Sequence, residues 1–205
     1  ICKCPNASAG DTEVINGITY TAVVNSTLYV KLHGTNEPSN YLCTTLVTSM
    51  DDIFFQRYSY NKDISFWDTS NVTSFWRTFS FARAFNQDIS GWDTSSATNM
   101  SQMFGGETSF NQDISGWDVS NVTNMRSMFG GADGFNQDIG GWDVSNVTNM
   151  QSMFWGADVF NQDLSGWDVT SVDDSLIISS ASACYNFSSE SIWTLPKPNF
   201  TNCTP

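Results

Sequence analysis

The sequence predicts an α/β repeat protein: a parallel solenoid of about six 25-residue coils, with a β-rich N-terminal cap and an irregular C-terminal cap. Two observations lead to this fold class. An aromatic residue and a tryptophan each recur every 25 residues, and all five cysteines lie outside the regular repeats. The recurring residues are Tyr60, Phe85, Phe110, Phe135 and Phe160, and Trp67, Trp92, Trp117, Trp142 and Trp167. We expect an N-terminal cap at 1–34, the solenoid at 35–174 and a C-terminal cap or tail at 175–205.

The N-terminal cap is predicted from a hairpin pattern. Residues 13–24 place Asn16-Gly17 between segments that alternate apolar and polar side chains, which is typical of two strands joined by a tight turn. Leu28–Leu32 could add a third strand. Such a sheet would cover the open end of the solenoid and protect its edge from other chains.

Each coil is expected to contain one strand, one corner and one short helix. An extended segment at 112–117 would turn Ile114 inward and Asp113 outward. Apolar residues then recur at i, i+3, i+6 and i+7, which favours one face of a helix. In one coil these residues are Val122, Met125, Met128 and Phe129. Ser120 or Asn121 would cap this helix, and Gly130-Gly131 would end it. This arrangement is typical of a leucine-rich-repeat solenoid.

The repeat motif also resembles that of a known family. Residues 110–129 and 135–154 follow the pattern Phe-Asn-Gln-Asp-Ile-x-Gly-Trp-Asp-Val-Ser-Asn-Val-Thr-Asn-Met-x-Ser-Met-Phe. This pattern is similar to the repeats of BspA-like surface proteins, which are relatives of leucine-rich-repeat proteins. The resemblance covers about residues 42–172. It implies a secreted or surface-exposed location and a role in adhesion or recognition, and it brings no catalytic residues. Residues 1–34 and 175–205 depart from the repeat.

The charge of the chain argues against several classes of partner. It has 21 acidic and 8 basic residues, a formal net charge of −13. Binding to nucleic acid or to an anionic membrane surface needs clustered basic residues. The sequence has no apolar stretch long enough to cross a membrane, so membrane insertion is not expected. It opens Ile1-Cys2-Lys3-Cys4 rather than with a signal peptide, and we expect a mature, extracellular form.

Asparagine sequons and cysteines both favour secretion. Nine Asn-x-Ser/Thr sequons occur, at Asn6, Asn25, Asn71, Asn99, Asn121, Asn146, Asn186, Asn199 and Asn202. The cysteines are Cys2, Cys4, Cys43, Cys184 and Cys203. Their positions at the two ends predict disulfide-tied caps. We expect Cys184 to pair with Cys203, and Cys43 with Cys2 or Cys4, which leaves one cysteine over. Zinc is disfavoured because His33 is the single histidine.

One column of aspartates is a candidate metal site. Here a column means equivalent positions 25 residues apart. The candidates are Asp88, Asp113, Asp138 and Asp163. Carboxylates on adjacent strands would lie ~5 Å apart and repel, and Ca²⁺ would relieve that repulsion. The favoured alternative is that each aspartate accepts hydrogen bonds from backbone N–H groups or hydroxyls of the next coil, so that no cofactor is required. For the aspartates that follow the recurring tryptophans, the Asp-x-Ser pattern predicts a hydrogen-bonded corner.

The sequence predicts a non-enzymatic protein, because its carboxylates repeat in every coil, whereas acid–base catalysis needs one in a distinct environment. We expect a secreted glycoprotein for adhesion, recognition or extracellular structure. Its partners would be proteins or glycans at a cell surface, or copies of itself. One alternative is a filament or coat subunit that assembles head to tail. A second is a carbohydrate-binding or carbohydrate-processing protein. Trp76, Arg126 and Trp155 interrupt columns of small or polar residues, as binding centres do.

Overall fold

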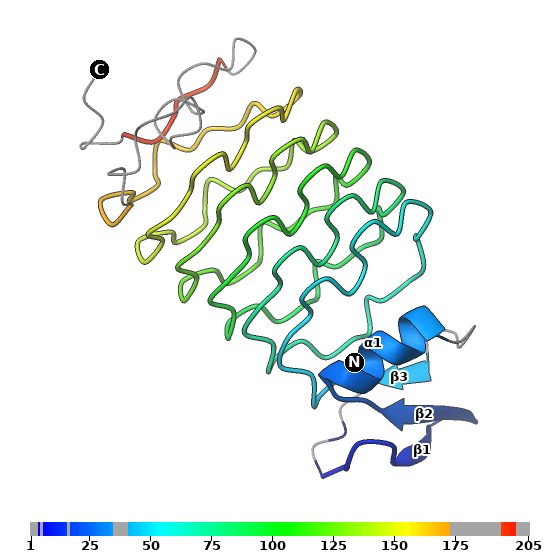
Figure 1. The fold of residues 1–205 in the computed structure, drawn as a ribbon. Helices are drawn as coiled ribbons and strands as arrows, with labels where there is room; N and C mark the ends of the chain where they lie inside the picture. The colour runs from blue at the N-terminus through cyan, green and yellow to red at the C-terminus, as the bar shows by residue number, and fades with distance from the viewer. Residues whose placement is uncertain (1–3, 5, 16, 35–40, 173–193, 200–205) are drawn as a thin grey trace.

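The N-terminal part of the molecule contains a small sheet and a helix. The structure is a computed structural model that describes residue 4 and residues 6–15, 17–34, 41–172 and 194–199. In chain order the elements are β1 (Thr12–Ile15), β2 (Ile18–Ala22), α1 (Asn25–Gly34) and β3 (Leu42–Cys43). After β3 the chain winds in successive turns that lie side by side (Figure 1). We call residues 41–172 the repeat stack and each 25-residue turn a unit.

The hairpin predicted at the N-terminus is confirmed. β1 and β2 pair in antiparallel register, with Ile15 opposite Ile18. Gly17, in the connection, has a φ of 78°, the left-handed conformation that two-residue Asn-Gly turns require. β2 then pairs in parallel with β3, where Ala22 lies opposite Cys43. The sheet therefore joins the hairpin to the first unit of the stack.

The third strand predicted at Leu28–Leu32 is wrong, because this segment belongs to α1. Leu28 and Leu32 are one helical turn apart and are 0% and 8% exposed, whereas Tyr29 and Val30 face outward. The spacing of the two leucines suits a helix that buries one side against the core, and it outweighs the strand preference of the residues between them. α1 has 10 residues, and no helix in the described part of the chain is long and apolar enough to span a membrane.

The predicted fold class, an α/β leucine-rich-repeat-like solenoid of about six strand–corner–helix coils, is wrong. Within the described residues α1 is the single helix, and it lies before the repeats. The named strands β1 to β3 all end by Cys43. The repeated units consist of turns joined by isolated parallel bridges, which link Ser49, Ser74, Asn99, Asn124 and Asn149 in succession.

Backbone hydrogen bonds explain why the apolar spacing does not produce a helix. The N–H groups of Met50 and Phe54 donate to the carbonyls of Ser74 and Thr78 in the next unit, both at 2.9 Å. An α-helix would use these groups within its own length. Between them, Ile53 donates to the carbonyl of Met50, three residues earlier, at 3.3 Å. Three-residue turns also bring every third side chain inward, so they satisfy the same apolar pattern.

Left-handed residues recur in the same segments. The non-glycine residues with positive φ are Asp52, Gln56, Arg77, Phe81, Gln102, Ser127 and Ser152. A left-handed residue interrupts the regular dihedral angles of an α-helix. These residues therefore turn the backbone so that alternate N–H groups point to the neighbouring unit.

The core of the stack is built from ladders of aromatic side chains. Phe110 stacks on Phe85 and on Phe135, with ring centroids 6.1 and 6.2 Å apart. The indole N–H of Trp117 donates to the carbonyl of Ile89 in the preceding unit at 3.1 Å. Trp92, Trp142 and Trp167 make the same bond at the same length. The recurring aromatic and tryptophan columns are thus the structural framework of the repeats.

Both ends of the stack are covered by segments of the chain itself. At the N-terminal end the Asn25 Oδ1 accepts the N–H groups of Thr48 and Ser49 at 2.8 and 3.2 Å. At the C-terminal end the Asn161 Oδ1 accepts the N–H group of Thr194 at 2.7 Å. The N–H group of Leu164 donates to the Pro196 carbonyl at 2.9 Å. Polar backbone groups that another unit would satisfy are therefore already bonded at both ends.

Candidate functional site

The aspartates that follow the tryptophans form the predicted corners. The Asp118 Oδ1 accepts the N–H group of Ser120 at 3.0 Å and its hydroxyl at 2.6 Å. Asp93, Asp143 and Asp168 make equivalent bonds to Ser95, Ser145 and Thr170. The Ser120 side chain lowers the pKa of Asp118 by bonding its charged form, and the Ser120 backbone N–H adds to this effect. This column has a structural role in every unit.

The aspartates of the candidate metal column accept hydrogen bonds within their own unit, rather than from the next unit as expected. Asp88 and Asp163 accept the N–H groups of Ser90 and Ser165, and Asp113 and Asp138 bond Ser115 and Gly140 in the same way, each at 2.9 Å. All four aspartates are exposed. In the part of the chain that the structure describes, no group of three or more His, Cys, Asp or Glu residues is arranged to hold a metal ion. Calcium binding at this column stays a prediction.

The asparagines that follow the recurring aromatic residues link each unit to the next. The Asn111 Oδ1 accepts the N–H group of Asn136 at 2.9 Å and the side-chain amide of Gln137 at 2.9 Å. Asn86 and Asn136 accept the same pair of donors from their own next units. These side chains occupy backbone donors that would otherwise be unpaired, so this column too is structural.

The sequons lie at positions of different exposure. Asn6, Asn25, Asn71, Asn121, Asn146 and Asn199 are exposed, Asn99 is half-buried, and Asn186 and Asn202 lie outside the described residues. The side-chain amides of Asn71, Asn121 and Asn146 each donate to a carbonyl of the preceding unit at 2.8 Å. One amide hydrogen of each is thus used within the stack. Glycosylation of all nine sequons stays a prediction.

One of the two partners left open for Cys43 is realised in the structure. Cys4 and Cys43 form a disulfide that closes a sequence separation of 39 residues. It ties the N-terminal segment to β3, the strand that leads into the stack. Cys2, Cys184 and Cys203 lie outside the described residues.

A hollow of about 340 Å³ lies on the described part of the repeated surface. Its lining consists of Trp76, Asn99, Ser101, Gln102, Asn124 and Arg126. We call it the Trp76–Arg126 hollow. It arises from one column, in which Asp51, Trp76, Ser101, Arg126 and Gln151 occupy equivalent positions in successive units. The small side chain of Ser101 lies between two large ones, so the surface is recessed at that unit.

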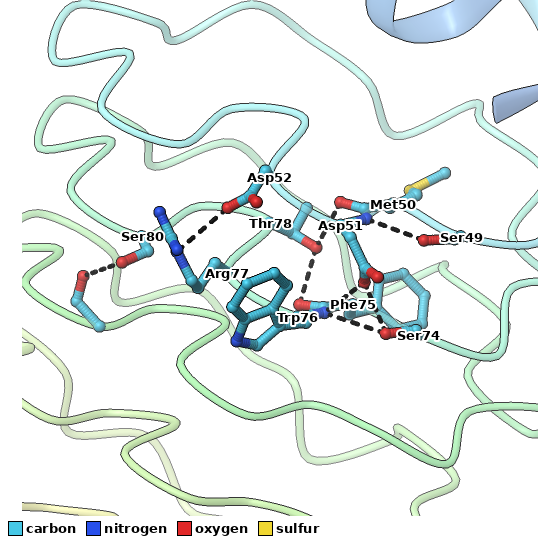
Figure 2. A network of polar contacts seen from close by, with 11 residues as sticks. Ser49, Met50, Asp51, Asp52, Ser74, Phe75, Trp76, Arg77, Thr78 and Ser80 are labelled. Atoms are coloured by element: carbon cyan, nitrogen blue, oxygen red, sulfur yellow. Dashed lines mark hydrogen bonds and ion pairs between the residues drawn. The ribbon is translucent and has the colours of Figure 1, made fainter. Parts of the chain in front are cut away.

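Trp76 is held in place by the residues around it. Its backbone N–H group donates to the Asp51 Oδ1 at 3.0 Å. The guanidinium of Arg77 lies 4.8 Å from the Trp76 ring centroid and 3.6 Å from that of Phe55. Arg77 is fixed in turn by an ion pair with Asp52, at 3.0 Å, and Figure 2 shows this pair beside the Trp76 ring. Trp76 is 36% exposed, and its indole forms an aromatic wall that Arg77 supports.

Arg126 forms the opposite wall and differs from the other arginines. Arg57 donates to the Leu32 carbonyl, Arg77 pairs with Asp52, and Arg83 lies over a tyrosine ring. Arg126 is engaged through its backbone: its N–H group donates to the Asn124 Oδ1 at 3.0 Å, and its carbonyl accepts the Gln102 N–H group at 2.8 Å. Among the described residues its guanidinium has no partner. An unpaired cation in so acidic a chain is available to an anionic ligand.

The chemistry of the hollow suits binding rather than catalysis. Its six lining residues supply an aromatic ring, a guanidinium, amides and a hydroxyl. None of the six is an Asp, Glu, His, Cys or Lys, so the lining holds none of the side chains that most often act as a general base and could activate a serine. The Ser101 hydroxyl donates to the Asn99 Oδ1 at 2.7 Å rather than to a base.

A buried carboxyl group lies in the same unit as Ser101. Glu107 is 0% exposed, and the equivalent positions in the neighbouring units are alanines, Ala82, Ala132 and Ala157. Its Oε2 accepts the N–H groups of Ser109, at 2.8 Å, and of Phe110. Its Oε1 has no hydrogen-bond partner among the described residues. Desolvation raises the pKa of Glu107 to about 7, although the backbone hydrogen bonds oppose this shift.

Comparison with known proteins identifies a family for this arrangement. The family model described as "Mycoplasma protein of unknown function, DUF285" matches residues 26–117 and 89–191, which together cover most of the chain. The chain belongs to this family. No curated protein and no solved structure matches it. Membership in DUF285 is consistent with the BspA-like resemblance, and it assigns no function, because the family's own description gives none.

The matched segments of the DUF285 chain include the whole Trp76–Arg126 hollow. Sequence reasoning singled out Trp76 and Arg126 but did not place them together, and it grouped them with Trp155, which does not line the hollow. It missed Ser101, Gln102 and Asn124. The recess could have been inferred from the order of residues in a single column of the repeat alignment, where a small serine lies between a tryptophan and an arginine. Glu107 was missed as well, although it stands out against alanine at the equivalent positions.

Proposed function

We propose that this DUF285 chain is a secreted, N-glycosylated protein of the BspA-like kind that recognises a partner at a cell surface and carries no catalytic activity. The observation that carries this proposal is the Trp76–Arg126 hollow. The repeated aspartate and asparagine columns are engaged in bonds within or between units, so they serve the stack. The hollow combines exposed tryptophan and arginine, the residues most enriched in the energetic centres of interfaces.

The capped ends weigh against the alternative of a head-to-tail filament or coat. Asn25 and Asn161 direct their side-chain oxygens to backbone donors of this chain, where another unit would otherwise bond. A further copy could stack only by displacing α1 or residues 194–199. The described ends therefore favour a recognition protein over an assembly subunit.

Binding of the purified protein to cells tests the proposal. We expect fluorescently labelled protein to bind saturably to cells, and the double variant Trp76→Ser/Arg126→Gln to bind at least tenfold more weakly. Each substitution introduces the residue found at an equivalent position, Ser101 or Gln151. The stack should therefore remain folded, which circular dichroism and thermal unfolding will check.

Trp155→Ala provides the matched control, because this tryptophan is 61% exposed and lies outside the hollow. It should bind cells like the unaltered protein. Equal binding by the folded double variant would show that the hollow is not the recognition site. Loss of binding in the Trp155 variant alone would place the site elsewhere on the stack.

A further inference from the structure

The two walls of the hollow are separated by a distance that suits a sugar. Trp76 and Arg126 occupy the same column two units apart, and neighbouring rungs of a parallel ladder lie ~4.8 Å apart. The backbone positions that carry the two walls are therefore about 10 Å apart, with Ser101 between them. A pyranose ring with a carboxylate substituent spans this gap, so the ring and the charged group can contact both walls at once.

The polar groups of the floor match the hydroxyls of a sugar. Ser101 is 6% exposed, and its backbone N–H and hydroxyl both bond the Asn99 Oδ1. The side-chain amides of Gln102 and Asn124 line the hollow as well. In the described structure no partner is found for the Gln102 side chain or for the Asn124 Nδ2. These amides can donate to or accept from sugar hydroxyls without breaking bonds of the stack.

The charge around the hollow permits an anion despite the net charge of −13. The two nearest acidic residues of these columns, Asp51 and Asp52, belong to the unit before Trp76. Asp52 is paired with Arg77. Asp51 lies three units from Arg126, about 14 Å away, which exceeds the Debye length of ~8 Å at physiological salt. A ligand carboxylate held at Arg126 is therefore largely screened from Asp51, which lies at the Trp76 end of the hollow.

We propose that the Trp76–Arg126 hollow binds a carboxylate-bearing sugar, such as a uronic acid residue of a cell-surface glycan. The apolar face of the pyranose ring packs on Trp76, the carboxylate bonds the guanidinium of Arg126, and the hydroxyls contact Gln102 and Asn124. This inference rests on the recognition function proposed above and names its ligand. An acidic peptide fits less well, because the lining offers no apolar pocket beside Trp76 for a side chain.

The proposal also constrains one sequon. Asn99 lines the hollow, and its Nδ2 lies 3.4 Å from the Ser74 hydroxyl. A glycan on Asn99 would fill the site. We therefore expect peptide mapping of the native protein to find Asn99 unmodified, and substantial glycosylation there would overturn the sugar site.

Calorimetric titration with methyl β-D-glucuronide and methyl β-D-glucoside tests the ligand class. We expect the glucuronide to bind at least tenfold more tightly than the glucoside. Arg126→Gln should weaken glucuronide binding about ten- to a hundredfold, as expected for a charge-assisted hydrogen bond. Trp76→Ser should weaken both sugars, and Trp155→Ala neither.

The outcomes separate the sugar proposal from the recognition function. Equal affinity for the two sugars, or glucuronide binding that is indifferent to Arg126→Gln, would overturn the carboxylate assignment. Absence of sugar binding, with cell binding still lost in the hollow variants, would overturn the sugar proposal and keep the hollow as a recognition site. If those variants also bind cells normally, both proposals fail.

Discussion

Replacing Trp117 by alanine is expected to lower the free energy of unfolding by about 3–5 kcal/mol, the usual cost of removing a large buried ring. Trp117 is 3% exposed, contacts Phe104 with ring centroids 6.3 Å apart, and bonds the Ile89 carbonyl of the preceding unit. The substitution therefore removes packing within the core and a hydrogen bond between units. Such a loss is a large part of the total stability of a typical domain. Urea unfolding followed by circular dichroism measures it.

Two control variants separate the causes. Trp155→Ala removes an exposed tryptophan and should change stability by less than about 0.5 kcal/mol. Trp117→Phe keeps most of the packing but loses the indole donor, at a cost of about 1 kcal/mol. The Ile89 carbonyl would still accept the backbone N–H group of Trp92, at 3.1 Å. If Trp117→Ala were as mild as Trp155→Ala, the tryptophan column would not be part of the core.

Stability is expected to fall with rising pH because of Glu107. Its ordinary pKa of 4.5 is raised to about 7 in the folded protein. Between these values the folded state holds a proton that the unfolded state releases. The contribution of Glu107 is thus fully present below about pH 4.5 and is lost as the pH rises through about 7, a change of roughly 3 kcal/mol.

Comparison with Glu107→Gln isolates this effect from that of the other carboxyl groups. The variant cannot ionise at this position, so its stability relative to the unaltered protein should grow between pH 5 and pH 8. Urea unfolding at several pH values gives the difference. A difference that stays constant over this range would show that Glu107 ionises freely in the folded protein and is not desolvated as described.

Much of the repeat could be predicted from the sequence, because a side chain that recurs at the same position has the same structural role in each unit. The period of 25 residues, the recurring aromatic column around Phe110 and the corner at Asp118 are all found in the structure. The Asn-Gly hairpin was predictable because so few residues accept positive φ at two successive positions.

The helix expected in each unit could not be excluded from the sequence. Val122, Met125 and Met128 are three residues apart, and this spacing fits tight turns as well as a helix. What decides between them is the direction of the backbone donors, which bond the next unit, as the N–H group of Met125 bonds the Asn149 carbonyl at 2.8 Å. The pattern of apolar side chains does not show in which direction the backbone N–H groups point. Residues with positive φ such as Ser127 cannot be recognised either, because serine is not a residue type that favours the left-handed conformation.

The hollow could be predicted only in part, because it depends on contrast between units. Trp76 and Arg126 were recognisable as interruptions of a column, but a recess exists only where a small residue lies between two large ones. Pairing them required knowledge that units stack directly, as the successive bridges at Ser74, Asn99 and Asn124 show. Trp155 interrupts a different column and is exposed without forming part of this recess.

Fluorine NMR of protein labelled with 5-fluorotryptophan tests most directly whether recognition occurs in the hollow. The chain has 8 tryptophans, and the Trp76 resonance can be assigned by its absence in Trp76→Phe. On addition of methyl β-D-glucuronide, we expect the Trp76 resonance to shift while those of the buried ladder and Trp155 stay in place. An unmoved Trp76 resonance at saturating glucuronide, or a shift of Trp155 instead, would contradict the assignment of this hollow as the binding site.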